Sequence, residues 1–323
     1  MNQVRPRIVF SPEYDIKFFG VEKLHPFDSC KYSRAWNKLL HQFGGDLRKI
    51  TVVPEEEAST SELELVHSTD YLLTLLKDSQ FLAKALEVLP LAIIPSKLID
   101  WSVLRPMRLA TKGTIIAAKQ ALECGVAVNL SGGYHHASRD SAEGFCIYSD
   151  IAVAIQKLRQ EKVLEVDDKV IVIDLDAHQG NGTERVFYKD RNVYIFDMYN
   201  KDIYPQDRWA RKRIDYDFPL DSKTDDVTYL NELEKGLERL IEQVQDAKVV
   251  FYNAGTDIYD KDPLGKLRIS AQGILERDKL VLNSCVKANI PCAMVLSGGY
   301  TRESYELVAR TVSYILEIWG IHK

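Results

Sequence analysis

The strongest constraint in this chain is an apolar run that ends abruptly in acidic and imidazole side chains. Residues 170–173, Val-Ile-Val-Ile, form a β-branched run typical of a parallel strand that helices cover on both faces. Asp174, Asp176 and His178 follow at a period of two, so an extended chain would place all three on one face. Carboxylate and imidazole groups at this spacing suit a divalent ion such as zinc. The alternative is a capped loop with a solvated carboxylate.

Two glycines follow this cluster and mark a turn. Gly180 and Gly182 give the backbone the freedom to change direction sharply. Asn181 or Thr183 is predicted to cap the next helix, because both side chains can accept a hydrogen bond from a helix N-terminus. The segment therefore indicates a strand that delivers polar groups to its carboxyl end.

The order strand, glycine-bearing polar loop, helix occurs three more times. Strands are predicted at residues 126–130, 248–252 and 291–296. The loops after them read Ser131-Gly-Gly-Tyr-His-His136, Asn253-Ala-Gly-Thr-Asp257 and Ser297-Gly-Gly-Tyr300. Strands that alternate with helices predict a mainly parallel sheet, and ligands bind such sheets beyond the carboxyl ends of the strands. The polar side chains of all four loops are therefore expected at one edge of the protein.

The first of these loops contains two adjacent histidines. His135 and His136 cannot share a face of a regular element, but a turn can aim both at one site. The alternative is a solvated loop with incidental histidines. Gly144 and Phe145 follow closely, and an aromatic side chain beside a glycine at such a loop either lines a pocket or fills the core.

The remaining periodicities complete an α/β pattern. Further strands are predicted at residues 7–10, 49–53 and 193–196, the last of them ending at Asp197. Two histidines, His25 and His67, are expected to be structural, and His67 is expected to make local hydrogen bonds near a helix start. Amphipathic spacing predicts helices at residues 31–43, 107–123, 149–160, 228–245, 271–288 and 303–319.

Composition favours one domain. No Pro/Gly/Ser-rich linker or low-complexity stretch divides the 323 residues, so residues 1–323 are expected to form a single domain. The formal net charge of −5 argues against a protein built to bind nucleic acid phosphates, and no direct nucleic acid partner is expected. The basic run of Arg208, Arg211, Lys212 and Arg213 is expected to be a solvated face.

Cysteine usage and the lack of long apolar runs indicate the cellular compartment of the protein. Five scattered cysteines, none in a CxxC pair, fit a reducing compartment. The first residues lack the apolar core of a signal peptide, and no apolar run reaches the roughly 18 residues that cross a bilayer. We therefore expect no membrane span and an intracellular location, cytoplasmic or nuclear. A secretion route without a cleaved signal would leave no trace in the sequence.

Longer motifs carry a family resemblance over nearly the whole chain. They include residues 22–28, Glu-Lys-Leu-His-Pro-Phe-Asp, residues 173–182, Ile-Asp-Leu-Asp-Ala-His-Gln-Gly-Asn-Gly, residues 252–257, Tyr-Asn-Ala-Gly-Thr-Asp, and residues 297–300, Ser-Gly-Gly-Tyr. In these motifs the sequence resembles the zinc-dependent histone deacetylases, most closely their class IV branch, typified by histone deacetylase 11. The resemblance implies the arginase/deacetylase fold, a single α/β domain whose mainly parallel central sheet is flanked by helices, with the site at the carboxyl ends of the strands.

The resemblance also implies roles for individual residues. The ligands of one catalytic zinc ion would be Asp176, His178 and Asp257. The catalytic group would comprise His135, His136 and Tyr300, with Asp174 hydrogen-bonded to His135 and Asn181 to His136. The substrate tunnel would be lined by Gly144, Phe145, Tyr204 and Leu264. A structural potassium ion would be held by side-chain and backbone oxygens of Asp174, Asp176, His178, Asp197 and Met198.

The chain departs from the family pattern at a few positions. Asn181 stands where many class I relatives have aspartate, in keeping with class IV. Lys31 stands near the place where class I enzymes carry an arginine at the pocket base, which suggests a different interior. Ser131 and Ser297 begin loops that more commonly begin with glycine, and neither change removes a reacting group.

The activity implied by the resemblance is hydrolysis of N6-acyl-lysine in proteins or peptides, with long fatty acyl groups preferred over acetyl. One alternative is deacetylation of acetyl-lysine or a small acetylated amine. A second is a binuclear manganese hydrolase of the arginase type, which needs additional bridging carboxylates. A third is a non-catalytic protein that binds acyl-lysine.

Overall fold

In the described part of the chain, eight parallel strands form one central sheet in the order β2-β1-β3-β8-β7-β4-β5-β6. The computed structural model describes residues 4–17 and 27–320, so His25 and most of the predicted motif at residues 22–28 lie outside the described residues. The sheet confirms the parallel α/β architecture predicted from the sequence. The strands are β1 (Arg7–Val9), β2 (Thr51–Val52), β3 (Val126–Asn129), β4 (Val170–Asp174), β5 (Val193–Asn200), β6 (Tyr216–Leu220), β7 (Val249–Asn253) and β8 (Cys292–Val295).

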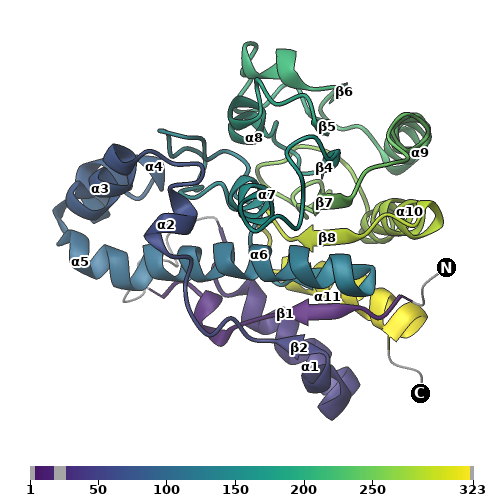
Figure 1. The fold of residues 1–323 in the computed structure, drawn as a ribbon, viewed down its shortest axis with the longest axis horizontal. Coiled ribbons are helices and arrows are strands. Elements are labelled where there is room, and N and C mark those ends of the chain that lie inside the picture. Colours follow the sequence, from purple (N-terminus) through teal and green to yellow (C-terminus); the bar gives the residue numbers. More distant parts are fainter. Residues whose placement is uncertain (1–3, 18–26, 321–323) are drawn as a thin grey trace.

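The helices form two packed groups that flank this sheet (Figure 1). One group contains α1 (Lys31–Lys49), α9 (Asp226–Gln243), α10 (Ala271–Ala288) and α11 (Ser304–Ile315). The other contains α2 (Thr60–Leu63), α6 (Arg105–Cys124), α7 (Asp150–Gln160) and α8 (Asn181–Val186). Within residues 4–17 and 27–320, none of the helices combines the length and the apolar character needed to span a membrane.

Short helical segments between α2 and α6 make a separate cluster at one end of the molecule (Figure 1). They comprise α3 (Thr69–Lys77), α4 (Ser79–Ala85), a 3-10 helix (Leu89–Ile93), α5 (Ser96–Ile99) and a π-helical turn (Asp100–Leu104). Pro90 and Pro95 interrupt the apolar sequence of this region, which explains why it breaks into several short pieces. For this region the sequence predicted only a helix start near His67.

Strand β4 lies between β5 and β7, and all five of its side chains are buried. Its last residue, Asp174, is in register with Asp197 on β5 and with Asn253 on β7. Because the three strands are parallel, their polar residues reach the same edge of the sheet. The sheet therefore gathers the loops that follow β3, β4, β7 and β8 at that edge, as the sequence predicts.

Several predicted boundaries differ from the structure. The strand predicted at residues 49–53 is only Thr51–Val52, because α1 continues through a kink at Gly44 as far as Lys49. The strand predicted to end at Asp197 continues to Asn200, where it pairs with the unpredicted β6. By contrast, α10 has the predicted bounds, since Ser270 caps its first turn and Asn289 ends it in a left-handed conformation.

Two local predictions are wrong. The helix after β4 has no side-chain cap, and Gly180 is its N-cap residue. The Asn181 side chain forms a hydrogen bond with His136 instead. The basic run at residues 208–213 is not a uniformly solvated face, since Arg213 is fully buried. Its guanidinium donates hydrogen bonds to the carbonyls of Phe187 and Asp190, and pairs with Asp215.

His67 is structural, as predicted, but its hydrogen bonds are not local. Its buried ring faces the Arg139 carbonyl through Nδ1 at 3.3 Å, and Nε2 accepts the Ser149 N–H at 3.0 Å. Accepting from that N–H requires a neutral ring with the proton on Nδ1. Burial chiefly lowers the pKa of His67 to about 4.

The low pKa of His67 predicts acid sensitivity of the fold. The unfolded chain, with a histidine pKa of about 6.5, binds more protons than the folded chain between pH 6.5 and 4. The contribution of this residue to stability is therefore complete above pH 6.5 and falls by about 3 kcal/mol as the pH approaches 4. Urea unfolding of the wild type and of His67→Gln across this range should show a shallower pH dependence in the variant. Parallel profiles would contradict the assignment.

Candidate active site

Three potential metal ligands converge beyond the carboxyl ends of β4 and β7. Donor atoms of Asp176, His178 and Asp257 all lie within 4.8 Å of one another, and all three residues are buried. His178 Nδ1 is 2.8 Å from Asp257 Oδ2 and 3.0 Å from Asp176 Oδ1. In the part of the chain that the structure describes, this is the only group of three or more His, Cys, Asp or Glu side chains arranged to hold a metal.

The charge balance of this group fits a divalent cation. Burial, and then the charge of Asp176, raise the pKa of Asp257 to about 7. Burial lowers the pKa of His178, but hydrogen bonds to Asp176 and Asp257 outweigh it and raise that pKa to about 10. The two buried carboxylates thus favour a positive charge beside them. A nitrogen and two carboxylate oxygens are a donor set that zinc accepts, with room for water or substrate in the remaining position.

Backbone groups orient the two carboxylates. The Ala177 N–H donates to Asp257 Oδ1 at 2.9 Å, and the Gly298 N–H donates to Asp176 Oδ2 at 2.8 Å. These bonds leave Asp257 Oδ2 and Asp176 Oδ1 turned toward His178. The glycine is required, because a Cβ at position 298 would lie 2.5 Å from a carboxylate oxygen of each aspartate. The glycines noted in the sequence therefore let the backbone approach the ligands closely.

The extended-chain argument for the residues after β4 is wrong in one respect. The strand ends at Asp174, and the backbone bends at residues 176–178, so a period of two no longer applies there. Asp174 is accordingly absent from the metal-binding group. Its Oδ2 lies 2.8 Å from His135 Nδ1, and its Oδ1 accepts a hydrogen bond from the Asn253 amide at 2.9 Å.

The two adjacent histidines meet at the site, and a different partner lies behind each. Their ring centroids are 4.1 Å apart. His135 faces Asp174, whereas His136 Nδ1 is 2.7 Å from Asn181 Oδ1. The Asn181 amide nitrogen points the other way, toward Glu143 Oε2 at 3.3 Å. Because Asn181 thus presents its oxygen, His136 carries a proton on Nδ1 and leaves Nε2 free to accept one.

These partners give the two rings different affinities for a proton. Burial lowers the pKa of His135, but the carboxylates of Asp174 and Asp176 outweigh it and raise that pKa to about 9. Burial, reinforced by His135 and His178, holds the pKa of His136 well below its usual range. His136 is therefore neutral, as a general base must be, while His135 is the more basic ring.

Tyr300 closes the site on the side opposite the paired histidines. Its ring centroid lies 6.0 Å from those of His178, Phe145 and Phe27. Burial and the charges of Asp176 and Asp257 hold the pKa of its phenol well above the usual range, so the hydroxyl keeps its proton. The Tyr300 N–H donates to Asp262 Oδ2 at 2.8 Å, which fixes the backbone that carries the ring.

A buried lysine supports the same loop. Lys31 is fully buried at the start of α1, and its Nζ donates to the carbonyls of Ser297 and Gly298 at 2.6 and 2.9 Å. Burial lowers its pKa to about 8, although Asp257 and Asp176 act in the opposite direction. Lys31 therefore ties the loop before Tyr300 to the first long helix.

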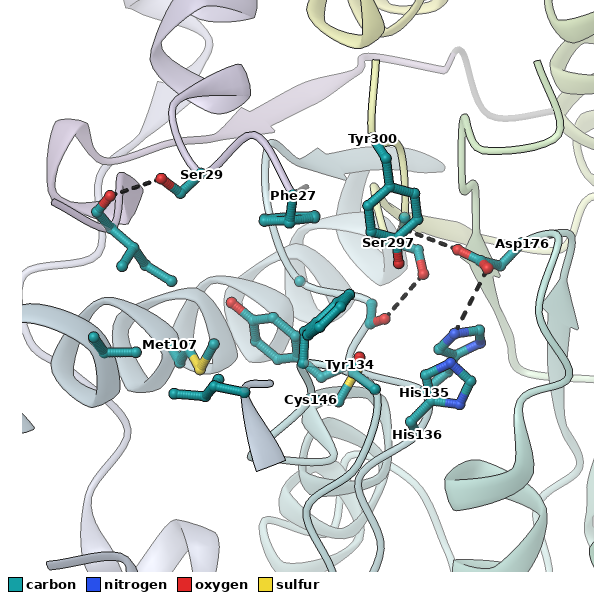
Figure 2. Close-up of a pocket in the computed structure, with 18 of the residues that line it drawn as sticks. Phe27, Ser29, Met107, Tyr134, His135, His136, Cys146, Asp176, Ser297 and Tyr300 are labelled. Carbon is teal, nitrogen blue, oxygen red and sulfur yellow. Dashed lines mark hydrogen bonds and ion pairs between the residues drawn. The ribbon is translucent and has the colours of Figure 1, made fainter. Parts of the chain in front are cut away.

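A largely apolar cavity extends away from the metal ligands (Figure 2). Figure 2 shows His135, His136 and Asp176 on one side, Met107 and Ser29 on the other, with Phe27 and Tyr134 between them. The cavity is also lined by Ile16, Leu86, Val88, Leu91, Val103 and Met107, and Figure 2 shows Met107 on the side away from the paired histidines. These residues were not predicted, because a single apolar position carries no signal of a pocket.

The residues predicted to form a tunnel divide into two pairs. Gly144 and Phe145 line the cavity. Tyr204 and Leu264 are not among the residues that line it. The Tyr204 ring lies edge-on to His136, with centroids 5.1 Å apart, and its hydroxyl donates to Glu143. No role was predicted for Asn253, although the sequence placed that residue in a polar loop at the same edge, and Asp262 was not singled out.

Asp197, one of the residues predicted to hold potassium, shares a hydrogen bond between carboxyl groups with Glu184. Asp197 Oδ2 also accepts the Gly180 N–H at 2.8 Å. Burial and the charge of Asp174 hold the pKa of Asp197 well above its usual range. Met198 is the next residue of β5, and its backbone lies beside β6.

The chain matches known proteins over most of its length. Residues 25–316 match the family model described as the histone deacetylase domain. Histone deacetylase 2 of Arabidopsis thaliana is 43% identical over 309 residues, which cover 94% of this chain and 77% of that protein. An uncharacterized protein of Picosynechococcus sp. is 34% identical over 305 residues, which cover 94% of this chain and 95% of that protein. The crystal structure of the HDA15 HD domain has the same fold, with a TM-score of 0.75 at 21% identity, covering 96% of this chain and 90% of that one.

Proposed function

Because the chain belongs to the histone deacetylase family, we propose that residues 1–323 form one catalytic domain of a zinc-dependent hydrolase that removes acyl groups from lysine side chains. The observation that carries this proposal is the position of Asp176, His178 and Asp257 beside the paired histidines and Tyr300, at one end of an apolar cavity. The substrate would be an acylated lysine of a protein or peptide.

The residues of the site suit hydrolysis of an amide. A zinc ion held by Asp176, His178 and Asp257 would supply Lewis acidity, which activates water and polarises a carbonyl. His136, neutral and with a free Nε2, would accept the proton of the attacking water and later return it to the leaving amine. His135 would contribute positive charge beside it. The Tyr300 hydroxyl would donate to the developing oxyanion.

We further propose membership of class IV and a preference for long fatty acyl chains. Asn181 in place of the commoner aspartate supports the class IV assignment. The apolar cavity supports the chain-length preference, because it continues past His135 and His136 to Met107. Each methylene buried there would contribute about 0.8 kcal/mol to substrate binding. An acetyl group would leave that part of the cavity without substrate contacts.

The test of this proposal is a side-by-side assay of acetyl-, octanoyl- and myristoyl-lysine peptides on protein of measured zinc content. Met107→Trp should fill the distant end of the cavity. We expect it to lower kcat/KM for myristoyl-lysine by about tenfold or more, the equivalent of two excluded methylenes, with little change for acetyl-lysine. Met107→Leu keeps the volume and is the matched control.

The alternatives give different results in the same experiment. A preference for acetyl-lysine would overturn the long-chain proposal and leave the hydrolase proposal intact. A zinc-bearing protein without hydrolytic activity would favour the acyl-lysine binder, and two metal ions per chain would favour the arginase-type hydrolase.

The potassium assignment is a separate proposal. Asp174, Asp176, His178, Asp197 and Met198 would hold a structural potassium ion, and the fully buried pair of carboxyl groups of Asp197 and Glu184 supports a cation there. An unfolding temperature that rises with potassium but not with choline would support it, and equal effects of the two salts would contradict it.

A further inference from the structure

Six large apolar side chains are exposed on the helical cluster between residues 69 and 104. Ile93, Leu89 and Trp101 are the most exposed, at 88%, 78% and 63%. The cluster spans about a ninth of the chain but holds six of the 13 exposed large hydrophobic residues among those described, so this exposure is concentrated and not scattered. We call these residues the apolar surface: Leu73, Leu76, Leu89, Ile93, Leu98 and Trp101.

The spacing of these residues places them in outward-facing pairs. Leu73 and Leu76 are three apart on α3, Leu98 and Trp101 are three apart at α5, and Leu89 and Ile93 are four apart on the 3-10 helix. Residues three apart are neighbours on a helical surface, whereas Leu89 and Ile93 are known to face outward from their exposure. The elements contact one another, since α3 packs against α4 and α5, and α4 against the 3-10 helix. The pairs therefore belong to one end of the molecule (Figure 1).

The inner side of the same cluster lines the apolar cavity. Leu86, Val88, Leu91 and Val103 are among the residues that line it. Leu91 lies between Leu89 and Ile93 in sequence and is buried, whereas Leu89 and Ile93 are exposed. One thin layer of chain therefore separates the apolar surface from the cavity in which a fatty acyl chain would lie.

The charges around the apolar surface balance. The exposed charged residues between positions 69 and 101 are three lysines, Lys77, Lys84 and Lys97, and three acidic residues, Asp70, Asp78 and Glu87. This part of the protein therefore lacks the cluster of basic residues that attracts proteins to anionic lipids. Apolar side chains with a tryptophan and no net charge suit insertion into the interfacial layer of a bilayer, whatever the headgroup charge.

We propose that the apolar surface binds the interface of a phospholipid bilayer and so places the cavity next to lysine-linked fatty acyl chains held there. The advantage for catalysis rests on the proposed long-chain activity, whereas the binding of the protein to a bilayer does not. A single fatty acyl chain holds a protein to a membrane only marginally and reversibly. A protein with one acylated lysine would therefore exchange between the bilayer surface and solution. An enzyme seated on the bilayer would meet such substrates at a high local concentration.

The test uses the full chain and vesicles of phosphatidylcholine alone. We expect the wild type to sediment with the vesicles equally well at low and high salt. The triple variant Leu89→Ser, Ile93→Ser, Trp101→Ser should bind at least about tenfold more weakly. Val166→Ser with Val227→Ser is the matched control, because these side chains are 74% and 69% exposed elsewhere and should not affect binding. Thermal unfolding verifies that each variant is folded.

Activity separates this inference from the proposed function. The triple variant should hydrolyse a soluble octanoyl-lysine peptide as fast as the wild type, but should be slower on a myristoyl-lysine peptide bound to vesicles. Failure of the wild type to bind vesicles, or equal binding by the triple variant, would overturn the inference while leaving the hydrolase intact. Self-association of the wild type that the triple variant loses would also overturn it, since a second copy would then cover the surface. Vesicle binding by a protein inactive on both peptides would support the surface and refute the proposed function.

Discussion

Asp257→Asn is expected to remove zinc binding and, with it, essentially all hydrolytic activity, while changing the stability of the metal-free protein little. The two effects differ because burial and Asp176 raise the pKa of Asp257 to about 7, so the metal-free carboxyl already holds a proton part of the time. Asparagine resembles that protonated form and can still accept the Ala177 N–H. It lacks the negative charge that a divalent cation requires. Loss of a mere hydrogen-bonding partner of a metal ligand costs about 10–100-fold in affinity, and loss of a ligand charge should exceed that range.

Zinc content after dialysis and thermal unfolding with and without added zinc measure this directly. Added zinc should raise the unfolding temperature of the wild type, because a ligand that binds only the folded state stabilises it, and should leave Asp257→Asn unchanged. Asp260→Asn is the control, since Asp260 is exposed three residues further along the same segment. Full zinc occupancy in Asp257→Asn would remove Asp257 from the proposed ligand set.

The sequence contains enough information to predict the sheet and the edge where the site forms. Uninterrupted apolar runs such as residues 170–173 occur where both faces of a strand are covered, and β4 is buried throughout. Parallel strands then bring their carboxyl ends together, which is why Asp174 lies in register with Asp197 and Asn253. The inference needs only the order of strands and helices, and no knowledge of which strands are neighbours.

Which polar group contacts which at that edge depends on loop conformation, and local patterns do not determine it. The period-two argument grouped Asp174 with Asp176 and His178, but the strand ends at Asp174 and the chain then bends. Asn181 was expected to cap a helix, yet its side chain reaches His136, 45 residues earlier in the chain. Such contacts follow from the packing of whole elements. Only the family resemblance pointed to these pairings.

The apolar lining of the cavity was even harder to predict from local sequence patterns. Val88 and Leu91 come from a proline-interrupted stretch that has neither strand nor long helical periodicity. Met107 is one of many buried positions on α6, and its sequence neighbours do not mark it as facing a cavity. The extent of the pocket, and hence the proposed acyl-chain length, arises from how short helices pack onto α6 and was therefore open until the fold was known.

Tyr300→Phe is expected to lower turnover by about 10²–10³-fold, the usual cost of losing one oxyanion donor, with zinc content and KM little changed. The reason is that the hydroxyl makes no hydrogen bond to any of the described residues, whereas the ring packs against His178, Phe145 and Phe27. Phenylalanine keeps the ring contacts, and the backbone bond to Asp262 is unaffected. Removing the hydroxyl should therefore affect the transition state and leave the fold intact.

The pH dependence of this variant separates donation of a hydrogen bond from proton transfer. Burial is the chief cause of the raised pKa of the Tyr300 phenol and would persist with zinc bound, so the phenol would act as a fixed donor in the neutral range. The residual activity of Tyr300→Phe should then follow the same pH profile as the wild type, displaced downward by a constant factor. Tyr314→Phe, which removes an exposed hydroxyl bonded to Asn283, is the control and should keep wild-type turnover. A Tyr300→Phe protein with full activity would exclude the oxyanion role, and a profile that loses one limb would identify Tyr300 as a proton donor instead.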